Sequence, residues 1–327
     1  MLQMDAIIAT GYGGPEVLKF AKRAIPVPED HEVLVRVHAS TVTRADTMMR
    51  TGKPYIGRLM VGLTKPKNTI PGTGFAGVVE TVGTKVKSFK KGDEVFGETA
   101  TEAGANAEFL AVSEQGVILH KPEELSFSDA ATLSDGPLTS MNFLKEVALI
   151  VPGQKVLING ASGSLGSAAV QLAKYFGAEV TAVSSHRNIG MVKGLGAAEV
   201  IDYTKNDPPA GDRKYDIIYD TVGTMSYKKA KKALAEEGQF ISPVLKSGLL
   251  GDMLFSGAFT KQKARFAATG LKSPDQLRPM MQELLSIYRE GKLKIIIDRQ
   301  YPLEKVADAH RYIDSGRKKG NVIIIHS

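Results

Sequence analysis

Cysteine is absent from this chain of 327 residues. Its absence excludes disulfide bonds, thiolate metal sites and a cysteine nucleophile. No apolar run approaches the ~20 residues that cross a bilayer, and residues 1–16 lack the charged-then-apolar layout of a secretion signal. Repeats and low-complexity segments are missing as well. With 43% hydrophobic and 24% charged residues, the composition predicts a globular cytoplasmic protein with no membrane partner.

The formal net charge is +7, from 42 basic and 35 acidic residues. The basic residues are interspersed with acidic ones, and a short cluster such as residues 228–232 is typical of the solvated face of a helix. This distribution does not favour nucleic acid as a partner. An anionic cofactor is sufficient reason for a mildly basic groove.

The chain has two parts with different sequence patterns. Residues 1–122 carry short alternating runs such as EVLVRVHAS and FAGVVETVG, which predict a small antiparallel β-domain. From residue 123 to 291, helical stretches alternate with strands, which predicts a doubly wound parallel sheet and an α/β fold. The strands are expected to end near Asn159, Ser184, Asp202, Asp220 and Pro243, with a sixth strand over residues 266–269. Residues 292–327 are predicted to return to the first domain.

The most informative stretch is VLINGASGSLG, residues 156–166. An apolar strand runs into Gly160, Gly163 and Gly166, and a helix follows from Ser164. This spacing allows a tight turn, close approach of a ligand and close helix–sheet packing. Free N–H groups at the helix N-terminus then favour a pyrophosphate, so Ser162, Ser164 and Leu165 join the glycines as candidate cofactor-binding residues. The alternative is that the glycines serve packing alone.

The end of the next strand indicates which nucleotide binds. An NAD site usually has an acidic residue there, whereas this chain has Ser184, Ser185, His186 and Arg187. Hydroxyls and a guanidinium can bind a 2′-phosphate that a carboxylate would repel. Tyr203 could close the same pocket. We therefore expect NADPH, although Arg187 could also be an ordinary solvated arginine.

Several segments along the whole chain resemble one known family. They are GYGGPEVLKF, VRVHASTVTRADTMMRTG, IPGTGFAGVVETVG, KKGDEVFG, VLINGASGSLGSAAVQLAK, GAAEVIDYTK and AHRYIDSGRKKGNVII. Together they resemble the medium-chain dehydrogenase/reductase superfamily, in its zinc-independent quinone oxidoreductase branch. The resemblance implies a GroES-like β-barrel domain, a Rossmann domain that binds NADPH, and a homodimer.

The same resemblance implies roles for residues outside the glycine turn. Thr139 matches a family threonine next to the nicotinamide, and Val222 should lie near the adenosine. Further neighbours of the nicotinamide half are implied at Ser242, Val244, Phe266 and Asn321. For these last residues the alternative is simple loop packing.

The chain departs from the zinc alcohol dehydrogenases of that superfamily. Thr43 stands where those enzymes have a cysteine ligand, and Gly72-Thr73-Gly74 replaces Gly-His-Glu. Hydroxyls are poor zinc ligands, and the histidines show no spacing of a metal site. We therefore expect no metal.

Without a Lewis acid, hydride transfer from nicotinamide requires an electron-poor acceptor such as a quinone or an α,β-unsaturated carbonyl. The candidate catalytic residues are Thr43, Asp46 and Tyr55. Asp46 could instead cap the following helix, and Tyr55 could donate a proton or merely pack.

Residues 53–68 form an apolar insertion with a possible helix. It is either a lid over the substrate or a surface loop or subunit contact. For the protein as a whole, the alternative to a reductase is a non-catalytic NADPH-binding redox sensor or scaffold, because no obvious acid–base pair stands out.

Overall fold

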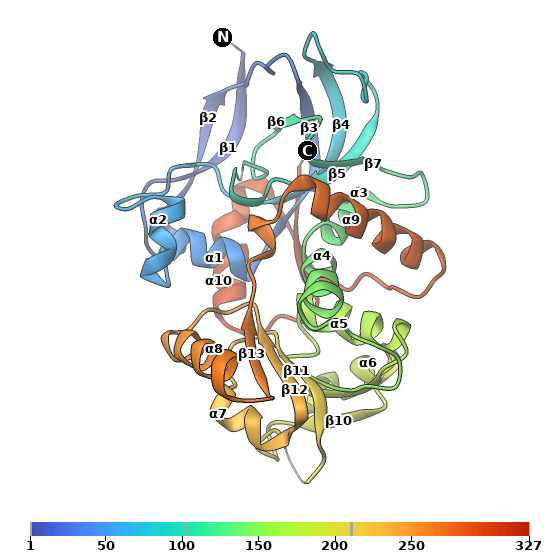
Figure 1. Ribbon diagram of the computed structural model, residues 1–327. Coiled ribbons are helices and arrows are strands. Elements are labelled where there is room, and N and C mark those ends of the chain that lie inside the picture. Colours follow the sequence, from blue (N-terminus) through green and yellow to red (C-terminus); the bar gives the residue numbers. More distant parts are fainter. Residues whose placement is uncertain (1, 103, 210–211, 327) are drawn as a thin grey trace. The chain divides into compact units, whose positions relative to one another are not determined.

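A computed structural model describes residues 2–102, 104–209 and 212–326, and the chain divides into two compact units (Figure 1). Unit 1 comprises Met1–Asp135, Gly270–Gln282 and Ile297–Ser327. Unit 2 comprises Gly136–Thr269 and Glu283–Ile296. The catalytic and cofactor domains drawn from the sequence, with their boundaries after residues 122 and 291, remain predictions.

Unit 1 is built on β-sheets, as the alternating runs predict. A small antiparallel sheet pairs β1 (Gln3–Ala9) with β2 (Leu18–Ala24). A larger sheet has the order β14-β15-β3-β4-β5-β7, with β6 also paired to β3, and is antiparallel except between β14 and β15. Its strands are β3 (Glu32–Val42), β4 (Gly74–Val82), β5 (Glu94–Glu98), β6 (Phe109–Ser113), β7 (Val117–His120), β14 (Ile297–Pro302) and β15 (Asn321–Ile325).

The helices of unit 1 are short and lie at the ends of strands. The α-helices are α1 (Arg44–Thr51), α2 (Arg58–Val61), α3 (Phe127–Leu133) and α10 (Val306–Asp314). The 3₁₀ turns are η1 (Pro15–Val17), η2 (Tyr55–Gly57), η3 (Ala100–Glu102) and η8 (Leu303–Lys305). One apolar core joins α10 to β15 through buried Val306, Ile313 and Ile324.

Unit 2 is a parallel sheet in the order β10-β9-β8-β11-β12-β13. Its strands are β8 (Lys155–Asn159), β9 (Glu179–Ser184), β10 (Glu199–Asp202), β11 (Tyr215–Asp220), β12 (Leu234–Ser242) and β13 (Lys263–Phe266). Its helical elements are α4 (Gly136–Met141), the π-helix η4 (Asn142–Val147), α5 (Ser164–Tyr175), η5 (His186–Asn188), α6 (Ile189–Gly194), α7 (Tyr227–Ala230), η6 (Lys231–Ala233) and α8 (Ser247–Phe259). Two further elements, η7 (Thr269–Leu271) and α9 (Pro274–Arg289), cross the bounds of the units.

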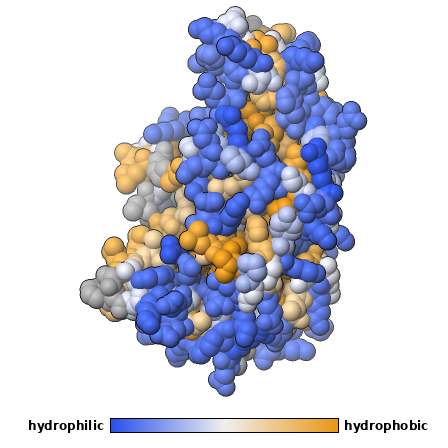
Figure 2. All heavy atoms as spheres, turned by 45° about the vertical axis from the view of Figure 1, so that its right-hand side comes forward, coloured by the Kyte–Doolittle hydropathy of each residue, from blue (hydrophilic) through white to orange (hydrophobic). Residues whose placement is uncertain are grey.

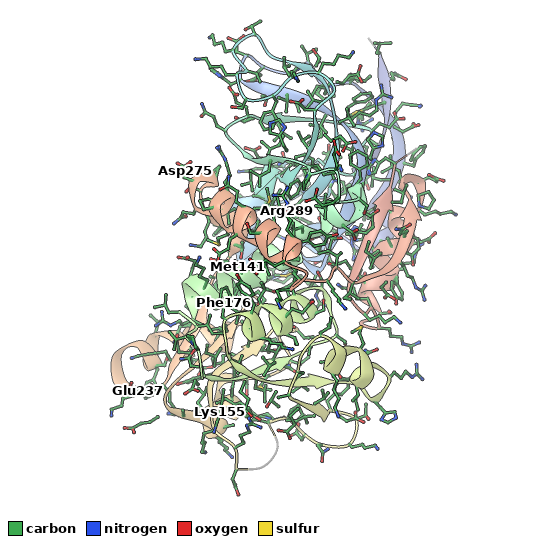
Figure 3. The ribbon with its side chains drawn as sticks, turned by 90° about the vertical axis from the view of Figure 1, so that its right-hand side faces the viewer. Met141, Lys155, Phe176, Glu237, Asp275 and Arg289 are labelled. Carbon is green, nitrogen blue, oxygen red and sulfur yellow. The ribbon has the colours of Figure 1, made fainter. Side chains whose placement is uncertain are left out.

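The β8–α5 segment shows why this sequence forms this unit. Val156, Leu157 and Ile158 are fully buried because a central parallel strand is covered on both faces. In α5 the residues at helical spacing, Ala169, Leu172 and Ala173, are also fully buried. Figure 3 labels Lys155 at the start of β8 and Phe176, the residue that caps the C-terminus of α5. The predicted strand, turn and helix are therefore confirmed here.

One sequence-based expectation needs correction. The strand expected over residues 266–269 ends at Phe266, because β13 pairs with β12 only from Lys263 to Phe266; η7 follows from Thr269. The possible helix in the 53–68 insertion is present among the described residues as η2 and the single turn of α2. Gly62 ends α2, since it takes φ +124°.

Across the described residues, no helix is both long enough and apolar enough to cross a membrane. On the face shown in Figure 2, hydrophilic residues cover most of the surface and hydrophobic residues gather in separate patches.

Candidate cofactor and active site

The turn between β8 and α5 requires glycine at its first position. Gly160 takes φ +78°, a left-handed conformation that side chains disfavour. A Cβ atom there would also lie 2.2 Å from Cγ2 of Val222. Gly160 therefore makes the tight turn and lets the loop after β11 pack against it.

The other two glycines of the motif differ in what surrounds them. A Cβ on Gly166 would lie 2.1 Å from the Gly160 carbonyl oxygen and 2.7 Å from Cα of Ala161, so close packing of α5 on the turn excludes it. A Cβ on Gly163 would meet nothing closer than the Gly160 oxygen at 3.5 Å, an ordinary contact. Gly163 also has an extended backbone, φ −79° and ψ −178°, which any residue can adopt. The protein's own packing explains Gly160 and Gly166 but does not explain Gly163.

The turn lies at the topological switch point of the sheet. Strand order runs outward from β8 through β9 to β10 on one side, and from β11 through β12 to β13 on the other. In open sheets of this kind, ligands bind outside the carboxyl ends of the strands at the switch point. The loops that follow β8 and β11 meet at that point.

Asp220, at the end of β11, organises the second of those loops. Its fully buried carboxylate accepts hydrogen bonds from Asn159 Nδ2 (2.8 Å) and from the backbone N–H groups of Gly223 (3.0 Å) and Met225 (2.8 Å). The carboxylate thereby fixes the loop that carries Val222, whose side chain is half-exposed beside Gly160.

Ser242 and Val244 continue the same edge of the sheet. Ser242 Oγ donates to the Asp220 carbonyl oxygen (3.0 Å) and accepts from the Val244 N–H (3.2 Å). A Cβ atom on Gly223 would lie 2.7 Å from the side chain of Val244. Phe266 is the register partner of Ser242 on β13. The carboxyl ends of β11, β12 and β13 thus bring four of the predicted cofactor residues to the edge where the glycine turn follows β8, namely Val222, Ser242, Val244 and Phe266.

The predicted phosphate pocket is held by a residue that sequence reasoning missed. Asn188 Nδ2 donates to Ser162 Oγ (3.0 Å) and to Ser185 Oγ (3.4 Å), and so joins the glycine turn to the end of β9. Ser184 is buried, while Ser185 is half-buried. The backbone N–H of Tyr203 donates to the Ser184 carbonyl oxygen (3.2 Å), so Tyr203, which is exposed, lies next to this strand end.

Arg187 lies in η5 and is exposed. Among the residues that the structure describes, it forms no ion pair, so its guanidinium is available to an anion. The neighbouring His186 Nδ1 lies 3.5 Å from the carboxylate of Asp202. That carboxylate also accepts from Thr204, and these hydrogen bonds lower the pKa of Asp202.

Thr139 lies on α4, which packs against the start of α5. A Cβ atom on Gly136 would lie 2.2 Å from Ser164 Oγ, and Ser140 Oγ donates to the Leu165 carbonyl oxygen (2.8 Å). Thr139 is therefore on a helix that directly contacts the N-terminus of α5. Asn321, by contrast, belongs to unit 1, where it is buried at the start of β15.

In unit 1, Thr43 and Asp46 form a capping box at the start of α1. The Thr43 N–H and hydroxyl donate to Asp46 Oδ2 at 2.7 and 2.8 Å, and the Asp46 N–H donates to Thr43 Oγ1 at 3.3 Å. Both side chains are buried. Burial is the largest influence on Asp46 and raises the pKa of its carboxyl, although these hydrogen bonds oppose the shift. Asp46 is thus the helix cap that the sequence allowed as an alternative.

Tyr55 lies in η2 and its side chain is 66% exposed. The guanidinium of Arg58 lies 4.8 Å from the centre of its ring and 4.3 Å from that of Tyr12. Of the other apolar residues in the insertion, Leu59 and Leu63 are exposed, and the side chains of Ile56 and Met60 lie outside the described set. Tyr55 is therefore accessible to solvent.

A group of ionisable residues near α1 was not predicted from the sequence. Burial, and secondly the Asp46 carboxylate, raise the pKa of Asp135 to about 7. Burial and the Asp135 carboxylate raise the pKa of Glu98 well above its usual range. Burial lowers the pKa of Lys318 to about 8, opposed by the nearby Asp135. No local pattern marks Glu98, Asp135 and Lys318, because they come from three separate segments of the chain.

Comparison with known proteins identifies the family. An alcohol dehydrogenase GroES-like domain matches residues 29–123, and a zinc-binding dehydrogenase domain matches residues 195–324. A 2-methylene-furan-3-one reductase of Solanum lycopersicum is 35% identical over 334 residues, covering 98% of this chain and 79% of that protein. The chain belongs to the medium-chain dehydrogenase/reductase superfamily, in its quinone oxidoreductase-like branch.

Other members of the branch are similar over nearly the full length. A quinone oxidoreductase of Homo sapiens is 31% identical over 335 residues, covering 96% of this chain and 94% of that protein. The solved quinone oxidoreductase of Coxiella burnetii superposes with a TM-score of 0.89 at 27% identity, covering 99% of each chain. The mixed α/β fold, with a GroES-like domain and a Rossmann-like parallel sheet, is therefore the fold of this superfamily.

One matching domain is described as zinc-binding, but the donor set here does not suit zinc. The side chains at the two family ligand positions are Thr43, engaged in the capping box, and Thr73, and hydroxyls are poor zinc ligands. No group of three or more His, Cys, Asp or Glu residues that could hold a metal ion occurs within the described part of the chain.

Proposed function

We propose that this protein is an NADPH-dependent reductase of quinones or α,β-unsaturated carbonyls that works without zinc. The observation that carries the proposal is Gly163, a glycine that neither packing nor backbone conformation demands. A missing side chain at the N-terminus of α5 leaves its N–H groups open to a close ligand, as a pyrophosphate requires. The names of the relatives support the substrate class, since they include quinone oxidoreductase and NADPH-dependent alkenal/one oxidoreductase.

The proposed cofactor residues fall into groups by the part of NADPH that each would bind. The glycine turn, with Ser162, Ser164 and Leu165, would bind the pyrophosphate, and Val222 would lie at the adenosine. Ser184, Ser185, Arg187 and Tyr203 would bind the 2′-phosphate. Support comes from the hydrogen bonds of Asn188, which fix two hydroxyls near one another, and from the exposed position of Arg187 in η5. Thr139, Ser242, Val244, Phe266 and Asn321 are proposed for the nicotinamide half.

Bound nicotinamide supplies a hydride, and the protein's own residues must orient the acceptor and manage the proton. An electron-poor acceptor gives a delocalised oxyanion, which hydrogen-bond donors can stabilise without a metal. Thr43 is proposed to turn its hydroxyl from Asp46 Oδ2, to which it donates at 2.8 Å, to the substrate oxygen, while Asp46 positions Thr43 by accepting its backbone N–H at 2.7 Å. Tyr55, which is exposed, is the proposed proton donor.

The test is NADPH oxidation by the purified chain in EDTA, against ortho-quinones, para-quinones and linear enones. Turnover is expected on at least one class and should be lost in Gly163→Val, since a branched side chain would block the phosphate. Gly190→Ala is the matched control, because Gly190 lies in α6 with open space around its Cβ position. NADPH binding without turnover on any acceptor would instead leave the protein as a redox sensor.

A cytoplasmic location and a homodimer are further proposals. Some relatives are named chloroplastic, so the compartment differs among related proteins. Size-exclusion chromatography with light scattering tests the dimer, and fractionation of the native host tests the location.

A further inference from the structure

The side chain of Asn188 lies between two serine hydroxyls that come from different loops of unit 2. Its Nδ2 atom donates to Ser162 Oγ in the glycine turn at 3.0 Å and to Ser185 Oγ after β9 at 3.4 Å. All three residues are half-buried, so part of their surface is open to solvent. Because both oxygens lie within hydrogen-bond distance of one nitrogen atom, a single phosphate group is large enough to contact both hydroxyls.

The direction of these hydrogen bonds decides what the two hydroxyls can offer a ligand. An amide nitrogen only donates, so each serine oxygen accepts from Asn188 and keeps its own hydrogen. Within the described part of the chain, neither hydroxyl hydrogen has an acceptor. Ser162 and Ser185 therefore present two hydrogen-bond donors, and a phosphate, which has several acceptor oxygens, matches them.

Local structure fixes Asn188 in this position. Its N–H donates to the Ser185 carbonyl oxygen at 3.0 Å and closes the turn of η5. Although Asn188 precedes α6, its side chain caps none of the N–H groups of that helix. Ser162 comes close because β8 pairs with β9, and the loops after two adjacent parallel strands meet at the same edge of the sheet. The amide is thus committed to the hydroxyls rather than to the helix.

The charges at this edge favour an anion. Arg187, in η5, is exposed. The carboxylate of Asp202, at the end of β10, accepts from the Thr204 N–H at 3.0 Å and from its hydroxyl at 2.7 Å. His186 Nδ1 lies 3.5 Å from the same carboxylate. The negative charge of Asp202 is therefore engaged by its own neighbours.

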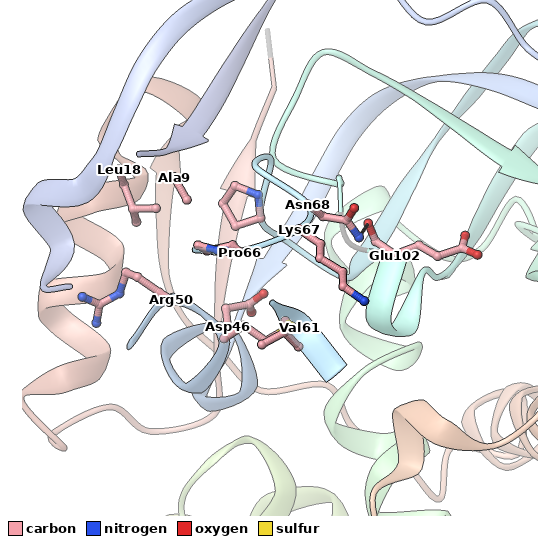
Figure 4. A pocket seen from close by; sticks show the side chains of 11 residues that line it. Ala9, Leu18, Asp46, Arg50, Val61, Pro66, Lys67, Asn68 and Glu102 are labelled. Carbon is pink, nitrogen blue, oxygen red and sulfur yellow. Dashed lines mark hydrogen bonds between the residues drawn. The ribbon is translucent and has the colours of Figure 1, made fainter. Parts of the chain in front are cut away.

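The charged groups beside α1 are arranged differently. Figure 4 shows Asp46 and Arg50 at the wall of a cavity of about 240 Å³ in unit 1. Arg50 Nη2 donates to Asp314 Oδ2 at 2.6 Å, and Asp46 Oδ2 accepts from the Thr43 N–H at 2.7 Å. Since these groups already bind partners within unit 1, the half-buried donors beside Asn188 are the stronger indication of a ligand.

We propose that Asn188 is a positioning residue that determines specificity for the 2′-phosphate of NADPH. By donating to both serine oxygens, it turns the hydroxyls of Ser162 and Ser185 toward one phosphate group, while the backbone of the glycine turn stays with the pyrophosphate. NADH gains less from this arrangement, because the 2′-hydroxyl is neutral and accepts more weakly than a charged phosphate oxygen. The inference rests on the proposed function and adds to it the roles of Asn188 and of the Ser162 hydroxyl.

The test is fluorescence titration of NADPH and NADH with the purified Asn188→Leu variant, which nearly keeps the side-chain volume and removes the amide. The Kd for NADPH should rise about tenfold, through loss of oriented charge-assisted hydrogen bonds, and the Kd for NADH should change less than about twofold. Asn206→Leu, at an exposed asparagine of the same unit, is the matched control and should change neither Kd. A merely structural role of Asn188 would raise both Kd values equally, and that result would overturn the proposal.

A double-mutant cycle tests whether Asn188 acts through the two serines. In a Ser162→Ala and Ser185→Ala background, Asn188→Leu should raise the Kd for NADPH by less than about twofold, because no hydroxyl is left to orient. A further increase of about tenfold in that background would show that Asn188 acts by another route, and would contradict the proposal.

The wild-type chain separates this inference from the proposed function. Equal Kd values for NADPH and NADH in the wild type would refute the proposed preference for NADPH itself. A wild-type preference for NADPH that persists unchanged in Asn188→Leu would refute only the role of Asn188.

Discussion

Two alanine substitutions in the glycine turn should separate cofactor binding from packing. Gly163 and Gly166 are three residues apart, yet an added Cβ would meet its nearest atom at 3.5 Å in one case and at 2.1 Å in the other. We expect Gly163→Ala to weaken NADPH binding with little effect on folding. We expect Gly166→Ala to destabilise the fold.

The magnitudes follow from the local geometry. Alanine suits the extended backbone of Gly163 and restricts the unfolded chain, a gain of about 0.4–1 kcal/mol. Alanine is also a poorer helix N-cap than glycine, a loss of similar size, so the free energy of unfolding should change by less than about 0.5 kcal/mol. At Gly166 the clashing atoms belong to backbone and cannot rotate away, so overpacking should cost about 2–3 kcal/mol.

The assay combines urea denaturation with fluorescence titration of NADPH. A methyl group at the N-terminus of α5 would push the phosphate away from its charge-assisted hydrogen bonds, so Gly163→Ala should raise the Kd for NADPH at least about tenfold. An unchanged Kd in Gly163→Ala would refute the argument that this glycine makes room for a ligand. A loss of stability equal to that of Gly166→Ala would refute it as well.

The remaining predictions concern specificity, capping and pH. Arg187→Glu should raise the Kd for NADPH by more than about 30-fold, or about 2 kcal/mol, and leave the Kd for NADH within a few-fold. The control Lys193→Glu, at an exposed residue of α6, should change neither Kd. An equal increase in both Kd values in Arg187→Glu would remove Arg187 from the 2′-phosphate site. Thr43→Val should lower the free energy of unfolding by about 1 kcal/mol because α1 loses its cap. Thr43→Ser keeps a capping hydroxyl, so in the same urea titration its free energy of unfolding should stay close to that of the wild type. A serine variant as unstable as the valine variant would contradict the capping role. Asp135 has a folded pKa of about 7, above its unfolded value, so its contribution to stability is present at low pH and is lost as pH rises from about 4 to 7. Asp135→Asn should flatten that part of the curve of unfolding free energy against pH, and an unchanged slope would show that Asp135 does not carry it.

The strand, glycine turn and helix within residues 155–175 could be predicted from the sequence because their determinants are local. They follow one another along the chain, and glycine spacing reflects backbone geometry that adjacent residues create. The ionisable groups near α1 could not be predicted, for the opposite reason. Thr43 and Asp46 lie in one motif, but the ionisable groups around them, Glu98, Asp135 and Lys318, come from distant segments.

Tertiary structure also added contacts that the sequence left open. Asp46 takes part in a capping box with Thr43 at the start of α1, and this hydrogen-bond geometry depends on where the backbone places both residues. Asn188 gave no sign in the sequence that it would join Ser162 to Ser185. That contact exists only because parallel strands β8 and β9 lie side by side.

The sequence by itself determined the family, the α/β architecture and the position of the glycine turn between β8 and α5, since family motifs, periodicity and glycine spacing are properties of residues that are close in the chain. Only the tertiary structure distinguished the surroundings of the three glycines, because these depend on how closely atoms from separate segments approach. The short distance from the Gly160 oxygen to a Cβ atom on Gly166 exists only in the folded chain.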